Sequence, residues 1–318
     1  MSLRKQLFTL ILTALLTVLF LLGIYTVFTK RCVDTGSEGL KAKSIELAAY
    51  LPFDESSQVA RVPSSLKLEG DLPILDGAAA LYPIFAAVVQ ATYPEDSVRF
   101  DGTDFAADSA LQYRNTRGAY KAIVDGEVDL IFCVDPSEEQ LAYAADKGVE
   151  LVFLPIGREA FVFLVNEKNP IETLTQEQSR GIYSGRYTNW SQVGGADRFI
   201  DPLQRNVGSG SQSQMERFMG GEPMKKPLFG FLGGAIGFSF RFYVEDLVTY
   251  GGVKMIAVDG VEPSVENVRS GAYPIVTNLY AVYRKGDDSP NLALLLDWLL
   301  SEEGQALVEA TGYVGVTK

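Results

Sequence analysis

The sequence predicts an α/β protein of two lobes, preceded by an N-terminal transmembrane helix. Three observations lead to this fold class. The chain has 318 residues, a length typical of two domains or of one domain built from two lobes. After residue 71, short apolar runs alternate with amphipathic stretches, which indicates a mainly parallel sheet with helices on both faces. Near the N-terminus lies a long apolar run that carries no charge.

The apolar run extends over 22 residues, from Leu7 to Phe28. At about 1.5 Å per residue it would span roughly 33 Å, enough for the bilayer core. A cleaved signal peptide is the alternative, but the run is longer than the usual signal-peptide core and no small-residue cleavage site follows it. Thr29, Lys30 and Arg31, which precede Cys32, are not the residues of a lipid-attachment site. We therefore expect an uncleaved anchor over residues 1–30.

Charge divides the chain into two parts. The formal net charge is −12; residues 1–43 hold six basic and two acidic side chains, which gives +4 there and leaves −16 for the remaining 275 residues. The basic residues after the apolar run do not favour an outward C-terminus. The acidic remainder argues against a nucleic-acid surface, which needs clustered Lys and Arg.

The elements follow in order after a predicted tether over residues 31–70, which contains proline and serine breaks and one short helix at residues 44–51. The predicted strands are residues 72–75, 98–100, 128–134, 149–154, 160–165, 238–242, 254–258 and 275–283. The predicted helices are residues 78–93, 116–124, one that begins at Ser137, 175–183, 212–219, 291–300 and 302–310.

Composition excludes several classes of site. The chain has no histidine and two cysteines. A Ser-His-Asp triad, a Cys-His pair, a His-ligated zinc and a four-thiolate metal site are therefore impossible. Adjacent carboxylates occur only in loops or at helix starts, where solvation or capping explains them. We expect no enzymatic activity, no metal and no cofactor.

The loop from Arg205 to Gln212 is the most informative candidate site. Its Gly and Ser residues precede a predicted helix, so backbone N–H groups would lie at the positive end of a helix dipole. Ser209 and Ser211 add hydroxyl donors, and Arg205 adds a guanidinium for an oxyanion. An ordinary loop with Arg205 in a surface ion pair is an equally good interpretation of this pattern alone.

Two other helix starts are weaker candidates. The loop from Asp76 to Leu81 offers N–H groups without a hydroxyl, and a plain helix start would explain it. Thr116 begins a predicted helix, where an N-cap is the simpler role for it.

Four stretches, in order, resemble the phosphate-binding proteins that serve ABC importers, which have the type II periplasmic-binding-protein fold. They are residues 76–83, Asn169-Pro170 together with residues 182–190, residues 205–211, which match the family's Arg-x-x-Gly-Ser-Gly-Thr/Ser motif, and residues 234–238. The resemblance covers about residues 70–318. It implies two lobes, the first formed by residues 71–157 and 275–318 and the second by residues 158–274.

In that family, hydroxyls, backbone N–H groups and one Arg hold an oxyanion in the cleft between the lobes. Carried over position by position, the resemblance implies a ligand site made of Ala79, Ala80, Leu81, Thr116, Asp135, Arg205, Ser209, Gly210 and Ser211. Two positions depart from the pattern. The first loop has Ala78, Ala79 and Ala80 where the family has a hydroxyl residue, and Cys133-Val134-Asp135 replaces the usual Ser-Asp.

The resemblance therefore implies a membrane-anchored, extracytoplasmic solute-binding protein for phosphate or a similar small oxyanion, with an ABC permease as its partner. An anchored sensor or interaction module that keeps the fold without transport is the alternative, motivated by the alanine-rich first loop. A carboxylate-dependent hydrolase is a third, weaker possibility, because no two acids lie in convergent loops.

Overall fold

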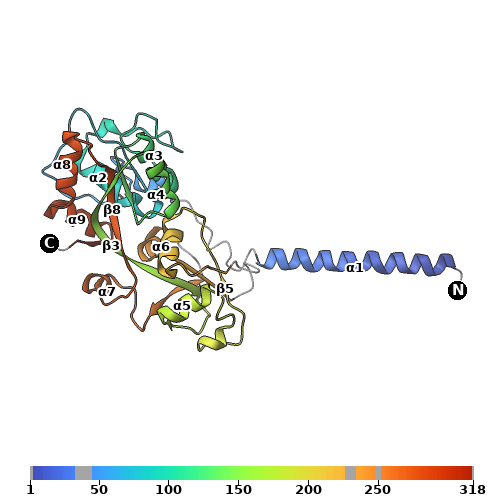
Figure 1. The fold of residues 1–318 in the computed structure, drawn as a ribbon. Coiled ribbons are helices and arrows are strands. Elements are labelled where there is room, and N and C mark those ends of the chain that lie inside the picture. Colours follow the sequence, from blue (N-terminus) through green and yellow to red (C-terminus); the bar gives the residue numbers. More distant parts are fainter. Residues whose placement is uncertain (1–2, 33–44, 226–233, 248–251, 317–318) are drawn as a thin grey trace.

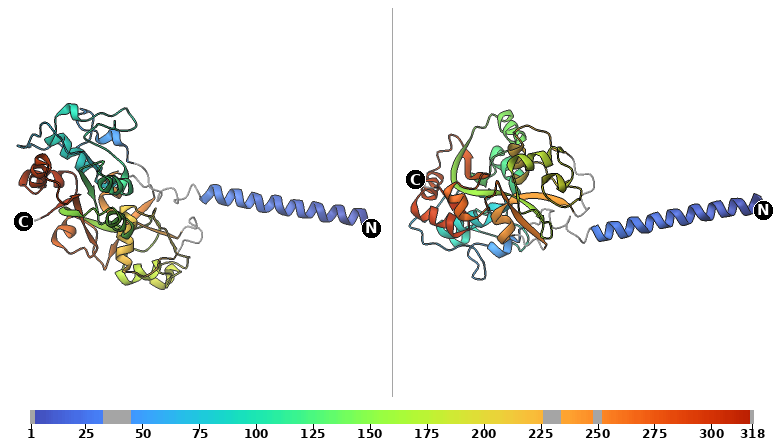
Figure 2. Two further views of the ribbon diagram at one scale, coloured as in Figure 1. Left: turned by 45° about the horizontal axis from the view of Figure 1, so that its top comes forward. Right: turned by 90° about the horizontal axis from the view of Figure 1, so that it is seen from below.

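The computed structural model describes residues 3–32, 45–225, 234–247 and 252–316. Helix α1 (Leu3–Cys32) stands apart from a body of two lobes, and β3 runs from one to the other (Figure 1). In two further views α1 again lies off the body (Figure 2). Among the residues whose positions are described, no helix has both the length and the hydropathy needed to cross a membrane.

The strands form one mixed sheet in the order β1-β2-β8-β3-β6-β5, with β4, β7 and β9 attached beside this path. Their bounds are β1 (Leu75–Gly77), β2 (Leu130–Cys133), β3 (Leu151–Asn166), β4 (Thr173–Leu174), β5 (Asp201–Pro202), β6 (Ala235–Phe240), β7 (Val253–Val258), β8 (Val276–Arg284) and β9 (Val314–Gly315).

The prediction of a mainly parallel sheet is wrong. Strands β1 and β2 are parallel, but β8 is antiparallel to β2, and β3 is antiparallel to β6, β7, β8 and β9. Strand–helix alternation alone did not reveal these antiparallel pairings. They arise because β3 and β8 are long strands that connect the two halves of the sheet.

Strand β3 joins two segments that the sequence predicts as separate strands, residues 149–154 and 160–165. Residues 151–160 pair with β8, and residues 161–165 pair with β6. The register shifts between Pro155 and Gly157, so the strand is irregular there but continuous. One strand thus belongs to both halves of the sheet.

The helices of the body are α2 (Tyr82–Thr92), α3 (Asn115–Asp125), α4 (Glu138–Asp146), α5 (Gln176–Tyr183), α6 (Gly210–Met219), α7 (Val265–Ser270), α8 (Pro290–Leu299) and α9 (Glu302–Ala310). Helices α4 and α5 begin with complete capping boxes, at Ser137/Gln140 and Thr175/Gln178. These boxes satisfy N–H groups that a helix start leaves unpaired, so the local sequence fixes both starts.

Two segments differ from the sequence prediction. Residues 98–100 form no strand; Phe100 makes one isolated bridge with Phe105. The predicted tether includes residues 33–44, which lie outside the described part of the chain. Residues 31–32 of it form the end of α1. Residues 45–70 pack against the body, where Ile45, Val59 and Leu68 are buried. Burial of these apolar side chains favours this packing over a solvated spacer.

Candidate functional site

Residues from three separate loops line one cavity of about 580 Å³. Its lining residues are Ala78, Ala79, Ala80, Asn115, Thr116, Arg117, Val134, Arg205, Asn206, Val207, Gly208, Ser209, Gly210, Ser211, Phe240 and Tyr243. Seven of the nine ligand residues implied by the family resemblance are among them. Leu81 and Asp135 are not in this lining.

The loop from Arg205 to Ser211 leads into α6 as the sequence suggested. Ser209 is the N-cap, and its hydroxyl accepts a hydrogen bond from the Gln212 N–H at 3.3 Å. The hydroxyl keeps its own proton for donation. Gly210 and Ser211 occupy the first two helical positions, where N–H groups have no partner within the helix. The backbone N–H of Arg205 donates to the Gln212 side chain at 2.9 Å, which fixes the loop below the guanidinium.

Thr116 is not the N-cap of α3. The cap position is Arg114, whose side chain makes no capping hydrogen bond, and Thr116 is the second helical residue. Its side chain is buried at the cavity wall. The start of α3 therefore has N–H groups without a side-chain cap, and a helix N-terminus in this state favours an anion.

Glycines allow the 205–211 loop to approach α3 closely. A Cβ at position 210 would lie 2.8 Å from Val134 Cγ2 and 3.5 Å from Thr116 Oγ1. Gly208 has φ +77°, and a Cβ there would lie 3.4 Å from Arg117 Cδ. The Gln140 side chain adds a hydrogen bond of 3.2 Å to the Gly208 carbonyl. The starts of α3 and α6 thus face the same space.

The first loop contributes backbone only. The Ala78 N–H donates to the Phe132 carbonyl at 2.8 Å, and the Leu81 N–H donates to the Ala78 carbonyl at 2.9 Å. Ala79 and Ala80 begin a short 3₁₀ helix, where the N–H groups have no partner inside the helix. Leu81 therefore uses its N–H within the loop, and Ala79 and Ala80 are the residues whose amides suit a ligand.

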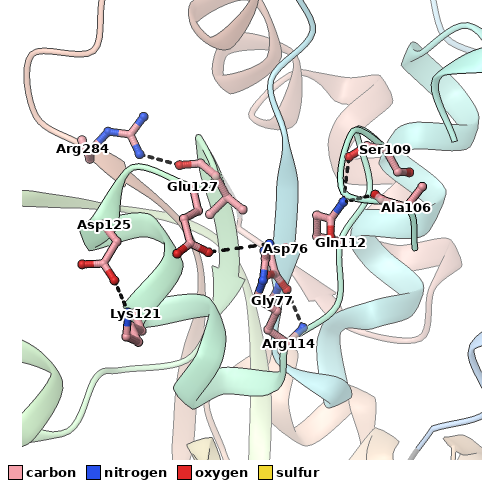
Figure 3. Close-up of polar contacts among 11 residues, drawn as sticks. Asp76, Gly77, Ala106, Ser109, Gln112, Arg114, Lys121, Asp125, Glu127 and Arg284 are labelled. Carbon is pink, nitrogen blue, oxygen red and sulfur yellow. Dashed lines mark hydrogen bonds and ion pairs between the residues drawn. The ribbon is translucent and has the colours of Figure 1, made fainter. Parts of the chain in front are cut away.

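An ion pair between the buried Asp76 and the half-buried Arg114, which the sequence reasoning missed, joins the first loop to the start of α3. Arg114 Nη1 lies 2.8 Å from Asp76 Oδ2, and Asp76 Oδ1 accepts hydrogen bonds from the N–H groups of Gly77 and Arg114 (Figure 3). Asp76 is fully buried, and burial raises the pKa of its carboxyl while Arg114 opposes that shift. The pair holds the end of β1 against the start of α3. An Asp-Gly turn and a distant Arg give no sequence signal for it.

Asp135 lies next to the cavity wall but engages other groups. Its carboxylate is 3.7 Å from Arg217 Nη2 on α6, and it raises the pKa of the neighbouring Tyr280 hydroxyl, after the larger effect of burial. Val134, the residue before it, lines the cavity instead. Arg117, Asn115 and Tyr243 line the cavity too, although the sequence did not single them out.

The site can hold a small anion. Arg205 and Arg117 line the site, and Arg117 also pairs with Glu139, whose Oε1 lies 3.3 Å from Arg117 Nη2. Thr116, Ser209 and Ser211 supply hydroxyls, and three helix starts supply amides. Among the described residues, no group of three or more acidic or cysteine side chains could hold a metal ion.

Comparison with known proteins finds similarities to a family model and to two relatives. Residues 74–228 match the model of the PBP superfamily domain. The phosphate-binding protein PstS of Bacillus subtilis is 26% identical over 265 residues, which cover 79% of this chain and 82% of that protein. Protein SphX of Synechococcus elongatus is 24% identical, over 80% of this chain and 82% of that protein.

Solved structures share the fold. A putative phosphate ABC transporter substrate-binding protein with bound phosphate, from Clostridium perfringens, has a TM-score of 0.59 at 21% identity and covers 78% of this chain and 100% of its own. An ABC-type phosphate transport receptor from Vibrio cholerae has a TM-score of 0.55 at 19% identity, over 77% of this chain and 100% of its own. The two-lobed α/β fold expected from the resemblance is therefore confirmed.

Proposed function

We infer, from the premise that this chain carries a periplasmic-binding-protein superfamily domain and resembles the phosphate-binding proteins of ABC importers, that it binds phosphate or a similar small oxyanion. One observation carries the proposal. The uncapped start of α3 and the start of α6 face one cavity, together with Arg205. Amides at helix starts and a guanidinium suit a tetrahedral anion.

We place the ligand in a cleft between two lobes, with residues 71–157 and 275–318 in the first and residues 158–274 in the second. The exchange of partners along β3, from β8 to β6 near residue 160, supports this division. Water occupies about 30 Å³ in the liquid, and a five-atom anion has only a few times that volume, so it would fill a minor part of the cavity. Ligand binding would therefore close the lobes around the anion.

We further propose that α1 anchors the protein in the cell membrane as a single pass, with the body on the extracytoplasmic side and an ABC permease as its partner. The uncharged run from Leu7 to Phe28 supports the anchor. Leucines at several positions of α1, including Leu10, Leu15 and Leu19, are more than half exposed, as the lipid-facing side of an anchor would be.

Calorimetric titration of the full chain in detergent tests the ligand. We expect saturable binding of phosphate, because the cavity supplies charge and oriented donors. The proposal fails if phosphate, arsenate and sulfate all give no heat at millimolar concentration. Arg186→Ala provides a matched control, because Arg186 pairs with Glu177 outside the cavity.

Fractionation of host cells tests the membrane anchor, and measurement of phosphate uptake tests the role in import. The full chain should sediment with membranes, and removal of residues 1–32 should release it. Deletion of the gene should reduce phosphate uptake. Unchanged uptake with altered signalling would instead support the anchored sensor.

A further inference from the structure

The cavity wall has donors and cations but no carboxylate. Its described lining contains two arginines, two asparagines, four hydroxyls and several backbone amides, and neither Asp nor Glu is among its residues. This is unusual in a chain whose acidic residues outnumber its basic ones by 12. Glu139, which is not in the lining, pairs with Arg117 at 3.3 Å, so the lining residues themselves include cations and no acid.

The acidic residue that adjoins the lining in sequence contacts other groups. Asp135 follows Val134 directly, and its carboxylate faces Arg217 and Tyr280. Val134 is buried, lines the cavity and packs where the 205–211 loop passes closest to it. At this point the wall therefore presents methyl groups to the cavity.

Whether the cavity wall holds a fixed hydrogen-bond acceptor decides how well the site distinguishes phosphate from sulfate. Sulfate and the phosphate dianion have the same charge and shape, but the phosphate dianion carries one proton. A site that holds a fixed acceptor for that proton rejects sulfate, because the buried acceptor would then face an oxygen without a hydrogen bond. Hydroxyls can donate or accept, so they adapt to either anion. Donors and hydroxyls alone therefore give little discrimination.

We propose that this cavity takes tetrahedral dianions as a class, sulfate as well as phosphate, without a strong preference between them. The inference rests on the proposed function, because it assigns the ligand class of the same cavity. It makes the wall at Val134 a determinant of specificity.

Titration of the full chain with phosphate and with sulfate, at pH 8 and at pH 6, tests the inference. At pH 8 we expect the two dissociation constants to agree within about tenfold. At pH 6 phosphate should bind about tenfold more weakly, since the dianion is then the minor species and apparent affinity scales with the competent fraction. Sulfate stays a dianion, so its affinity should not change.

The sulfate measurement also controls for titration of the protein. Glu159 lies buried behind the wall, where it faces Arg241, Glu245 and Tyr273, and burial raises the pKa of its carboxyl to about 7. Any effect of Glu159 would act on both anions, whereas the proton of phosphate acts on one. An equal loss of affinity for both anions at pH 6 would contradict the expectation that only phosphate binds more weakly there.

The outcomes separate the two proposals. If neither anion binds, the proposed function and this inference fail together. If phosphate binds and sulfate is about a hundredfold weaker at pH 8, the inference alone fails. Comparable binding of both supports it.

Two variants locate the determinant. Asp135→Asn should leave the phosphate-to-sulfate ratio unchanged, because that carboxylate lies near Arg217 and Tyr280 and is not among the lining residues. A selective gain of sulfate affinity of tenfold or more would overturn the inference. Val134→Asp places a carboxylate in the wall and should weaken sulfate at least tenfold more than phosphate. Since Val134 is buried and this variant can fail to fold, the wild-type ratio and Asp135→Asn keep the inference falsifiable.

Discussion

Single side chains decide how strongly the cavity can bind and how it responds to pH. Arg205 lies in the lining with the three hydroxyls at the starts of α3 and α6. The sequence picked out Arg205, Thr116, Ser209, Gly210 and Ser211, because local spacing reveals a Gly/Ser loop that leads into a helix. Sequence spacing did not reveal Arg117 or Tyr243, which reach the same cavity only through tertiary packing.

Arg205→Ala should weaken phosphate binding by about ten- to a hundredfold. A hydrogen bond to a charged group contributes roughly 1.5–3 kcal/mol, and about 1.4 kcal/mol corresponds to tenfold in affinity. Calorimetric titration of the full chain measures the change, with Arg186→Ala as the control that should keep wild-type affinity. Equal affinities for the Arg205 and Arg186 variants would remove Arg205 from the site.

Glu159 should make stability depend on pH. It is fully buried on β3 and pairs with Arg241, with Glu159 Oε1 3.3 Å from Arg241 Nε. Burial, only partly offset by Arg241, raises the pKa of Glu159 to about 7 from its ordinary value of 4.5. Between these values the folded chain holds a proton that the unfolded chain has released, so the free energy of unfolding falls as pH rises.

Glu159→Gln should abolish this contribution. Relative to the Gln variant, the wild type should lose on the order of a few kcal/mol of unfolding free energy between pH 5 and pH 8, because each unit of pKa shift corresponds to about 1.4 kcal/mol. Urea denaturation of both proteins at the two pH values gives the difference. A wild type that gains stability over the variant as pH rises would contradict the raised pKa.

At the level of elements, the site depends on the close approach of α6 to α3. Gly210 makes that approach possible, since a Cβ there would lie 2.8 Å from Val134 Cγ2, closer than real Cβ atoms come. The Asp76–Arg114 pair fixes the start of α3, which α6 approaches, to the end of β1. Helix starts were predictable from caps and acids, but their mutual placement was not.

Gly210→Ala should lower phosphate affinity at least tenfold, because the added methyl group pushes the start of α6 away from Val134 and Thr116. Calorimetric titration measures the phosphate affinity of this variant. Gly220→Ala is the matched control at the other end of α6: its φ of +62° makes Ala strained there, but open space surrounds it. The control should cost about 1 kcal/mol of stability and keep its affinity. If Gly220→Ala lost phosphate affinity and Gly210→Ala kept it, the phosphate site would lie elsewhere.

On the scale of the whole molecule, β3 and β8 run side by side and connect the halves of the sheet (Figure 1). The buried Glu159–Arg241 pair lies where β3 changes partners, and the Arg241 guanidinium also donates to the Gly312 carbonyl at 2.6 Å. Phe240, directly before Arg241, and Tyr243, two residues after it, line the cavity. If ligand binding closes the lobes as proposed, this part of the molecule would couple the cavity wall to that closure.

Saturating phosphate should reduce the radius of gyration and raise the melting temperature of the full chain. A ligand at a hundred times its dissociation constant stabilises by about 2.7 kcal/mol, which corresponds to roughly 5–10 °C for a domain of this size. Small-angle X-ray scattering and thermal denaturation measure the two effects, and Arg205→Ala at the same phosphate concentration should show smaller changes. A melting shift with an unchanged radius would exclude closure.

The sequence by itself indicated most of the helices, the longer strands, the glycine- and serine-rich loop at residues 205–211 and the family resemblance, because periodicity, caps and glycine spacing are local properties. It also indicated the departures at Ala78–Ala80 and around Val134. The tertiary structure alone decided that two predicted strands form one strand crossing the sheet, and that residues 45–70 are packed. It also turned Asp135 toward Arg217 and left Val134 in the wall. Strand direction, burial and side-chain partners depend on contacts between distant residues, and no local pattern encodes them.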